Sequence, residues 1–169
     1  MAVVYVKGLK ELYKQLQTVP VRMEKNIMRS ALLAGAQVVA KQVRVNAPVA
    51  EPSDRNRKRY GGYAGALRDS IKAGSTRIKG GKVRVSVRAG GGKNKKGADV
   101  YYAHWVEYGT KPHMNGRRGM HPGARPHPFM RPAADTAKGA AVVAVGNRIK
   151  QRLAKQGGLD TPDIVVEET

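Results

Sequence analysis

The chain has 169 residues, no cysteine, and 32 Lys and Arg against 12 Asp and Glu, for a formal net charge of +20. This length suits a single domain with a core of its own, the lack of cysteine excludes disulfides and thiolate metal sites, and no apolar run approaches the roughly eighteen residues of a membrane-spanning helix. The charge exceeds what solubility requires and indicates a polyanionic partner: DNA, RNA, an anionic membrane or an acidic protein.

The first fifty residues predict a short strand followed by two helices. Residues 3–6 are apolar and form the strand, and this run is too short for a signal peptide. Leu9, Leu12 and Leu16 are spaced for one face of a helix that begins after Gly8. A second helix is expected from about Val21 to Val45, because its apolar residues recur at helical spacing and its basic residues lie mostly elsewhere. That apolar stripe contains Met23, Ile27, Ala31, Ala34, Val38 and Val45.

The middle of the chain predicts a loop and a hairpin. Residues 51–65 are polar and strongly basic, so we expect an exposed loop there. Leu67 to Ile78 starts as a helical turn and passes into a strand. The strand at Lys82 to Ala89 alternates valines with Arg and Ser, which indicates a half-buried strand with a basic outer face. A turn at Gly80 and Gly81 joins the two strands, and residues 90–98 form a flexible basic tip.

The stretch "YYAHWVEYGT", Tyr101 to Thr110, holds four of the nine aromatic residues and is predicted to form a third strand. Both of its faces carry large apolar groups, so we expect a cover on each side. Helices supply one cover, and a neighbouring subunit is the natural candidate for the other. Glu107, the one acid in this strand, is expected to pair with an arginine across a contact.

The remainder of the chain predicts a long basic loop and a final helix. Pro132 suits the first helical position and Asp135 the positive first turn, while Gly157 ends the helix. The acidic residues 159–169 form a tail or a short edge strand. The expected class is α+β, with long helices packed on a small, mainly antiparallel β-sheet. One domain spans residues 1–158, with basic loops near 51–65, 90–98 and 111–126.

No catalytic, metal or cofactor site is expected. His104, His113, His121 and His127 lie nine, eight and six residues apart, without the short spacings or the carboxylate of metal-binding motifs. There is no serine in a nucleophile elbow, and Glu107 lacks a second carboxylate for acid–base work. The "GGK" at 80–82 fails as a phosphate-binding loop because a valine follows it. We therefore expect no enzyme activity and no small-molecule substrate.

Contact with nucleic acid is expected through the phosphate backbone. The basic runs lie in predicted loops, and no helix-turn-helix, zinc-finger or RNA-stacking motif is present to read bases. Phosphate contacts give salt-dependent affinity without sequence preference. The candidates for such contacts are Arg55, Arg57, Lys58, Arg59, Lys93, Lys95, Lys96, Arg117 and Arg118.

Five short motifs together resemble a family of tailed phages. They are "GLKELYKQL", "RSALLAGAQVVAKQVRVNAPV", "GALRDSI", "YYAHWVEYGT" and "PHPFMRPA", in that order. Over Gly8 to about Leu153 the chain is similar to small neck or minor tail proteins typified by the tenth gene product of phage Hong Kong 97. The insertion at residues 50–64 and the long loop at 111–125 depart from the family pattern, and they supply much of the positive charge.

The resemblance implies a structural virion protein of a long-tailed phage, assembled in the host cytoplasm. It would form a homo-oligomeric ring at the head–tail junction, as a connector that completes the tail and surrounds the DNA path. Its partners would be neighbouring neck and tail proteins and phage DNA, with no membrane. The residues expected in packing and ring contacts are Tyr102, Trp105, Glu107, Tyr108, Gly109, Thr110, Pro128, Phe129, Arg131 and Pro132.

Two alternatives remain open at this point. Each of these residues could serve only the core of one subunit. The chain could also be a free-standing basic nucleic-acid-binding protein, nucleoid- or ribosome-like, which would explain the charge but not two ordered aromatic motifs.

Overall fold

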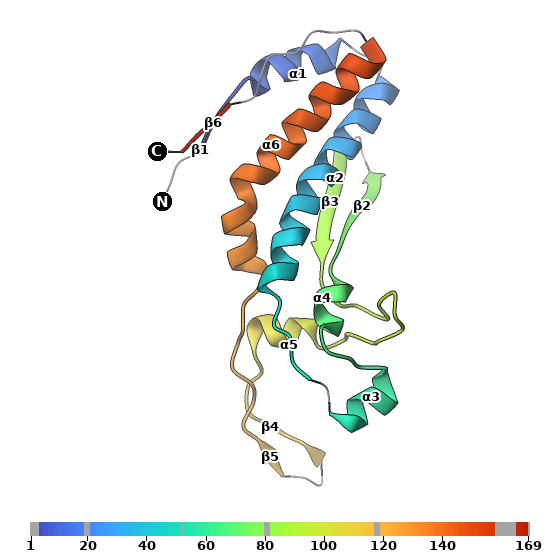
Figure 1. Cartoon of the computed structure of the whole chain (residues 1–169), viewed down its shortest axis with the longest axis vertical. Coiled ribbons are helices and arrows are strands. Elements are labelled where there is room, and N and C mark those ends of the chain that lie inside the picture. Colours follow the sequence, from blue (N-terminus) through green and yellow to red (C-terminus); the bar gives the residue numbers. More distant parts are fainter. Residues whose placement is uncertain are drawn as a thin grey trace. The chain divides into compact units, whose positions relative to one another are not determined.

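The computed structural model describes residues 4–18, 21–51, 53–79, 82–116, 119–157 and 165–168. The chain divides into two compact units, one made of Met1–Val39, Ala73–Val87 and Thr136–Thr169, the other of Ala40–Lys72 and Arg88–Asp135. Figure 1 shows the elements, which are β1 (Val4–Lys7), α1 (Leu9–Gln17), α2 (Val21–Asn46), α3 (Asp54–Tyr60), α4 (Ala66–Ser70), β2 (Lys72–Lys79), β3 (Lys82–Arg88), α5 (Ala103–Tyr108), β4 (His113–Met114), β5 (Met120–His121), α6 (Met130–Gly157) and β6 (Val165–Glu168).

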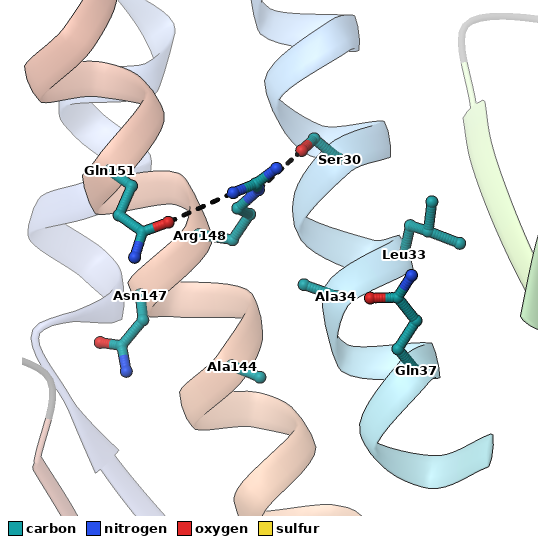
Figure 2. A pocket seen from close by; sticks show the side chains of 8 residues that line it. All are labelled: Ser30, Leu33, Ala34, Gln37, Ala144, Asn147, Arg148 and Gln151. Atoms are coloured by element: carbon teal, nitrogen blue, oxygen red, sulfur yellow. Dashed lines mark hydrogen bonds between the residues drawn. The ribbon is translucent and has the colours of Figure 1, made fainter. Parts of the chain in front are cut away.

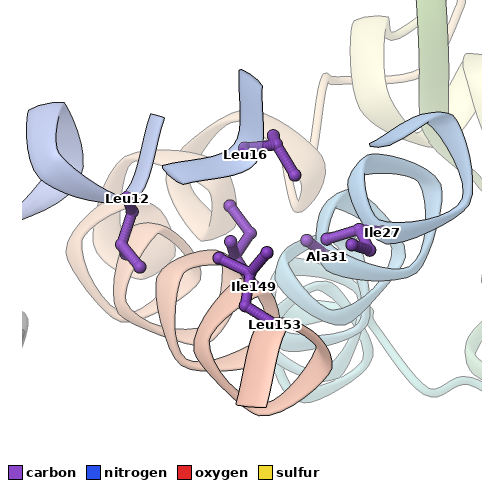
Figure 3. Packing of buried hydrophobic residues seen from close by; sticks show 6 residues of the cluster. All are labelled: Leu12, Leu16, Ile27, Ala31, Ile149 and Leu153. Carbon is purple, nitrogen blue, oxygen red and sulfur yellow. The ribbon is translucent and has the colours of Figure 1, made fainter. Parts of the chain in front are cut away.

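Three helices form the core of the first unit. Six buried side chains meet there, two from each helix, and members of each pair are four residues apart on one helical face. Figure 3 shows them: Leu12 and Leu16 from α1, Ile27 and Ala31 from α2, and Ile149 and Leu153 from α6. The apolar spacing predicted for the first two helices is therefore confirmed in this part of the chain.

A glycine lets α2 and α6 approach closely. A Cβ atom on Gly35 would lie 2.6 Å from Cγ2 of Val145 and 2.9 Å from the carbonyl oxygen of Ala141. Real Cβ atoms essentially never come that close, so any side chain here would push the two helices apart.

Among the described residues, the strands form three separate two-stranded pairs. The β1 and β6 strands are antiparallel, with Val4 opposite Glu168 and Lys7 opposite Val165, so the C-terminal segment does form a strand. The β2 and β3 strands are neighbours, and β3 keeps its valines half-buried and Arg84 and Arg88 exposed, as its alternation predicts. The turn expected at residues 80–81 lies outside the described residues. Long helices with a small antiparallel sheet confirm the α+β class.

The third strand predicted at Tyr101–Thr110 is wrong, because residues 103–108 form the helix α5. Ala103 and Glu107 are buried four residues apart. Tyr101, Trp105 and Tyr108, at spacings of four and three, are exposed. This is the pattern of one inner and one outer helical face, not of alternating strand faces.

Other expectations also need correction. The region 51–65 contains the helix α3, and the region 111–126 contains the hairpin of β4 and β5. The last helix begins at Met130, which makes Pro132 its third residue and leaves no acid in its first turn. Val45, placed on the apolar stripe of α2, is 71% exposed. None of the described helices is both long enough and apolar enough to span a membrane.

Candidate assembly surface

Glu107 links α5 to the start of α6 in the second unit. Its buried side chain accepts hydrogen bonds at Oε2 from the backbone N–H groups of Phe129 (2.8 Å) and Met130 (2.9 Å), and at Oε1 from that of Arg131 (3.3 Å). These are donors that a helix leaves unpaired at its N-terminal end. The predicted arginine partner is thus replaced by the backbone of α6. Burial by itself raises the pKa of this carboxyl, but the three donors and the nearby Arg131 charge outweigh it and hold the pKa below its ordinary value.

Gly109 and Thr110 turn the chain from α5 into the hairpin. Gly109 has φ 71° and ψ −176°, a region that essentially only glycine occupies. A Cβ atom there would lie 2.6 Å from the carbonyl oxygen of Ala124 and 2.9 Å from the nitrogen of Pro126. The backbone of Thr110 pairs in both directions with Ala124, at 2.9 and 3.2 Å. The chain therefore enters and leaves the segment that holds β4 and β5 at one place, where Thr110 pairs with Ala124.

The ten residues expected in packing or assembly separate into two sets. Glu107 and Phe129 are buried, Gly109 and Thr110 are half-buried, and these four hold α5, the hairpin base and the start of α6 together. Tyr102 is half-buried, and burial raises its pKa. The remaining five are exposed: Trp105, Tyr108, Pro128, Arg131 and Pro132.

Three exposed aromatic side chains lie on α5 or just before it. We call Tyr101, Trp105 and Tyr108 the aromatic face; they are 40%, 43% and 68% exposed. The rings of Tyr101 and Trp105 meet edge to face with their centroids 5.5 Å apart. The guanidinium carbon of Arg131 lies 6.0 Å from the centroid of Tyr108. Large aromatic groups kept together at a surface are typical of protein–protein contacts.

The hairpin of β4 and β5 carries a second exposed apolar group. Met114 lies opposite Met120, and both side chains are about two-thirds exposed; we call them the methionine pair. His113 lies opposite His121, with stacked rings whose centroids are 5.0 Å apart. Sequence reasoning missed this hairpin, although the Asn-Gly dipeptide at Asn115 is a known signal for one.

A buried asparagine anchors the basic loop at residues 90–98, which was expected to be a flexible tip. Oδ1 of Asn94 accepts hydrogen bonds from the backbone N–H groups of Lys96 and Ala98, both at 3.0 Å. Nδ2 of Asn94 donates to the hydroxyl of Tyr63 at 2.7 Å, and that hydroxyl donates to Asp69 at 2.9 Å. The loop is therefore tied to the segment around α4 by hydrogen bonds.

The basic residues predicted to contact DNA differ in their surroundings. Nζ of Lys96 lies 3.0 Å from Oδ2 of Asp69, and this pair raises the pKa of the lysine and lowers that of the aspartate. Lys58, Lys93 and Lys95 are exposed. Arg57 pairs with Glu51 at 3.0 Å and the guanidinium of Arg59 lies over the ring of Tyr60 at 5.4 Å. The side chain of Arg55, and Arg117 and Arg118 altogether, lie outside the described residues.

The α3 helix and the basic loop meet through the backbone. The N–H of Asp99, just after the loop, donates to the carbonyl oxygen of Tyr60 at the end of α3, at 2.9 Å. Two basic segments far apart in sequence therefore belong to one part of the second unit.

A groove in the first unit lies between α2 and α6 and has a volume of about 360 Å³ (Figure 2). Small residues and amides line most of it. Arg148 crosses it and donates to Oγ of Ser30 at 3.0 Å and to Oε1 of Gln151 at 3.3 Å. It offers no carboxylate pair and no nucleophile activated by a base. Within the described ranges, no three His, Asp or Glu side chains gather as a metal site would need.

One comparison with known proteins gives a match. The model of the family described as "Bacteriophage HK97-gp10, putative tail-component" matches residues 10–109. Searches of the curated proteins and of the solved structures found no match. The matched residues include α1, α2 and the aromatic face.

Proposed function

Since the chain belongs to the HK97-gp10-like family of bacteriophage tail components, we propose that its copies form a closed ring at the head–tail junction of the virion. The ring joins the tail to the head and surrounds the path of the DNA. Its role is mechanical, and its surfaces bind further copies of the chain and the neighbouring neck and tail proteins.

The aromatic face is the observation that carries this proposal. Trp105 and Tyr108 keep much of their surface in solvent although the chain has only nine aromatic residues with which to build a core. Aromatic groups bury a large area at little entropic cost, and clusters of them dominate the energetics of protein contacts. A head-to-tail contact repeated around an axis closes a ring when the rotation allows it.

The methionine pair adds a second contact. Met114 and Met120 stand opposite each other on the hairpin, beyond the point where Thr110 and Ala124 bring the two strands together. Methionine is flexible and adapts to irregular apolar surfaces. An arm with such a tip suits a neighbour's surface better than the core of its own unit.

The positive charge supports a position near DNA. The exposed Lys58, Lys93 and Lys95 belong to two segments that meet at Tyr60 and Asp99. Lysines that contact the DNA backbone neutralise phosphates without reading bases, so DNA can move past them.

The mass of the purified chain in solution tests the ring. We expect Trp105→Ala with Tyr108→Ala to raise the protein concentration needed for half-assembly at least tenfold, as a loss of about 1.4 kcal/mol or more per contact implies, while circular dichroism shows the wild-type helix content. Tyr13→Ala is the matched control, because Tyr13 is an exposed aromatic residue of α1 in the first unit. A chain that stays monomeric at every concentration, alone and with tails that lack it, would refute the proposal.

If the chain were instead a free-standing nucleic-acid-binding protein, the aromatic and the lysine substitutions would have the opposite effects. Substitutions of Lys93 and Lys95 would then abolish its activity, and the aromatic variant would keep it. In the ring, the lysine variants assemble normally.

A further inference from the structure

The second unit contains a pocket that combines aromatic walls with carboxylates. Its volume is about 380 Å³. Its lining includes aromatic residues and two acids: Tyr60, Tyr101, Tyr102, Trp105, Glu51 and Asp99. Only 12 acidic residues stand against 32 basic ones in the whole chain, so two acids in one aromatic pocket are notable.

The aromatic rings that line the pocket meet one another edge to face or at a tilt. Around the ring of Tyr101, the centroid of Tyr60 lies at 5.1 Å, that of Trp105 at 5.5 Å and that of Tyr102 at 5.8 Å. The faces of such rings are negative and attract cations. The guanidinium of Arg59 already lies over Tyr60, which shows that this unit pairs cations with its rings.

The two carboxylates differ in their partners. Glu51 accepts from Arg57 at 3.0 Å. Asp99 is half-buried, and no described residue donates a hydrogen bond to its carboxylate or forms an ion pair with it. An incoming cation would therefore find in Asp99 a carboxylate that has no counter-ion among the described residues.

We propose that this pocket receives the guanidinium of an arginine from a second copy of the chain, in contact with Tyr101 and Trp105 and donating to Asp99. A guanidinium is planar, weakly hydrated and able to bond a carboxylate with two donors, so it suits flat walls and a free acid better than an ammonium does.

The choice of a second copy rests on the proposed ring and on charge complementarity. Tyr101 and Trp105 belong both to the pocket and to the aromatic face. A subunit that docks on this face brings a surface rich in Lys and Arg to the mouth of the pocket. The carboxylate of Asp99, in a chain of net charge +20, then acts as the receptor for part of the same chain's excess charge.

The only tryptophan of the chain gives a direct test, because Trp105 lines the pocket. The full chain is titrated with N-acetyl-arginine amide at constant ionic strength while the tryptophan emission is recorded. N-acetyl-citrulline amide, a neutral molecule of nearly the same shape, is the matched probe. We expect a saturable change with the arginine probe only, weakened about fivefold in Asp99→Asn, as loss of one partly exposed charge pair implies.

Glu11→Gln, which removes an exposed acid of α1, should bind the arginine probe as the wild type does. No saturable change, an equal response to citrulline, or a response to a neutral oligosaccharide in place of arginine would each overturn the pocket assignment.

The oligomer mass of Asp99→Asn separates this inference from the proposed function. A variant whose ring dissociates at a several-fold higher concentration than the wild type supports the second copy as the source of the arginine. A ring equally stable in both forms overturns that source and leaves the proposed function intact. If the wild-type chain binds the arginine probe but forms no ring, both the second copy as the source of the arginine and the proposed function are overturned.

Discussion

At the scale of single residues, Glu107 determines how the last helix starts. One buried carboxylate satisfies three backbone N–H groups that lie 22 to 24 residues further along the chain. Charge-assisted hydrogen bonds of this kind are among the stronger ones in proteins. The residue therefore acts on the fold through α6 and not through the solvent or a partner.

We predict that Glu107→Gln lowers the free energy of unfolding at pH 7 by about 2 kcal/mol, because the amide loses the charge and one of its two acceptors. The pKa of Glu107 is lowered in the folded chain, so its contribution is fully present above the unfolded value and is lost as the pH falls through the folded value. Urea titrations should show the difference between wild type and variant shrinking below about pH 4.

Glu11→Gln is the control for this experiment, because it removes an exposed carboxyl of α1 with the same change in charge. This variant should change the free energy of unfolding little, both at pH 7 and below about pH 4. A gap between wild type and Glu107→Gln that stays constant from pH 7 to pH 3 would show that the charge of Glu107 is not what stabilises α6.

At the scale of elements, α1 depends on two leucines for its place in the first unit. Leu16 is 2% exposed and packs in the cluster that α1, α2 and α6 share. We predict that Leu16→Ala lowers the free energy of unfolding by about 3 kcal/mol, because burial is lost and a cavity is left behind. Tyr13→Ala, on the outer side of the same helix, should lower it by under about 1 kcal/mol. Urea unfolding measures both. Equal losses would mean that the leucine side of α1 does not face this core.

The elements also show what sequence patterns can and cannot predict. The α1 and α2 helices are long enough for apolar residues to repeat at helical spacing, and β3 alternates over a full strand, so all three are predictable. The α5 helix has six residues. Tyr101, Trp105 and Tyr108 fit a helix, but the aromatic and β-branched content of this stretch favours a strand, and so short a window does not decide between the two periods.

The candidate site was predictable as a set of residues but not as an arrangement. The motifs around Trp105 and Phe129 mark the right segments. The partners of Glu107, and the meeting of α3 with Asp99, depend on how loops of ten or more residues fold back. The spacing of residues along the chain carries no such information.

At the scale of the whole molecule, the net charge of +20 should appear as weak, salt-sensitive DNA binding. We predict that Lys93→Gln with Lys95→Gln reduces the slope of log affinity against log salt by about 2, one phosphate contact per lysine. Lys10→Gln with Lys14→Gln removes the same charge from exposed positions of α1 and should leave the slope nearly unchanged. Fluorescence anisotropy across a salt series gives both slopes. Binding that persists undiminished at high salt would contradict a backbone-only contact.

The antiparallel pairing of β1 with β6 joins the two ends of the chain in one ladder, with Val4 opposite Glu168. A tag or fusion partner added at either terminus therefore emerges from the same place and strains the same four residue pairs. Shortening one end removes the hydrogen-bonding partner of the other, so a truncation made at a single terminus acts on both.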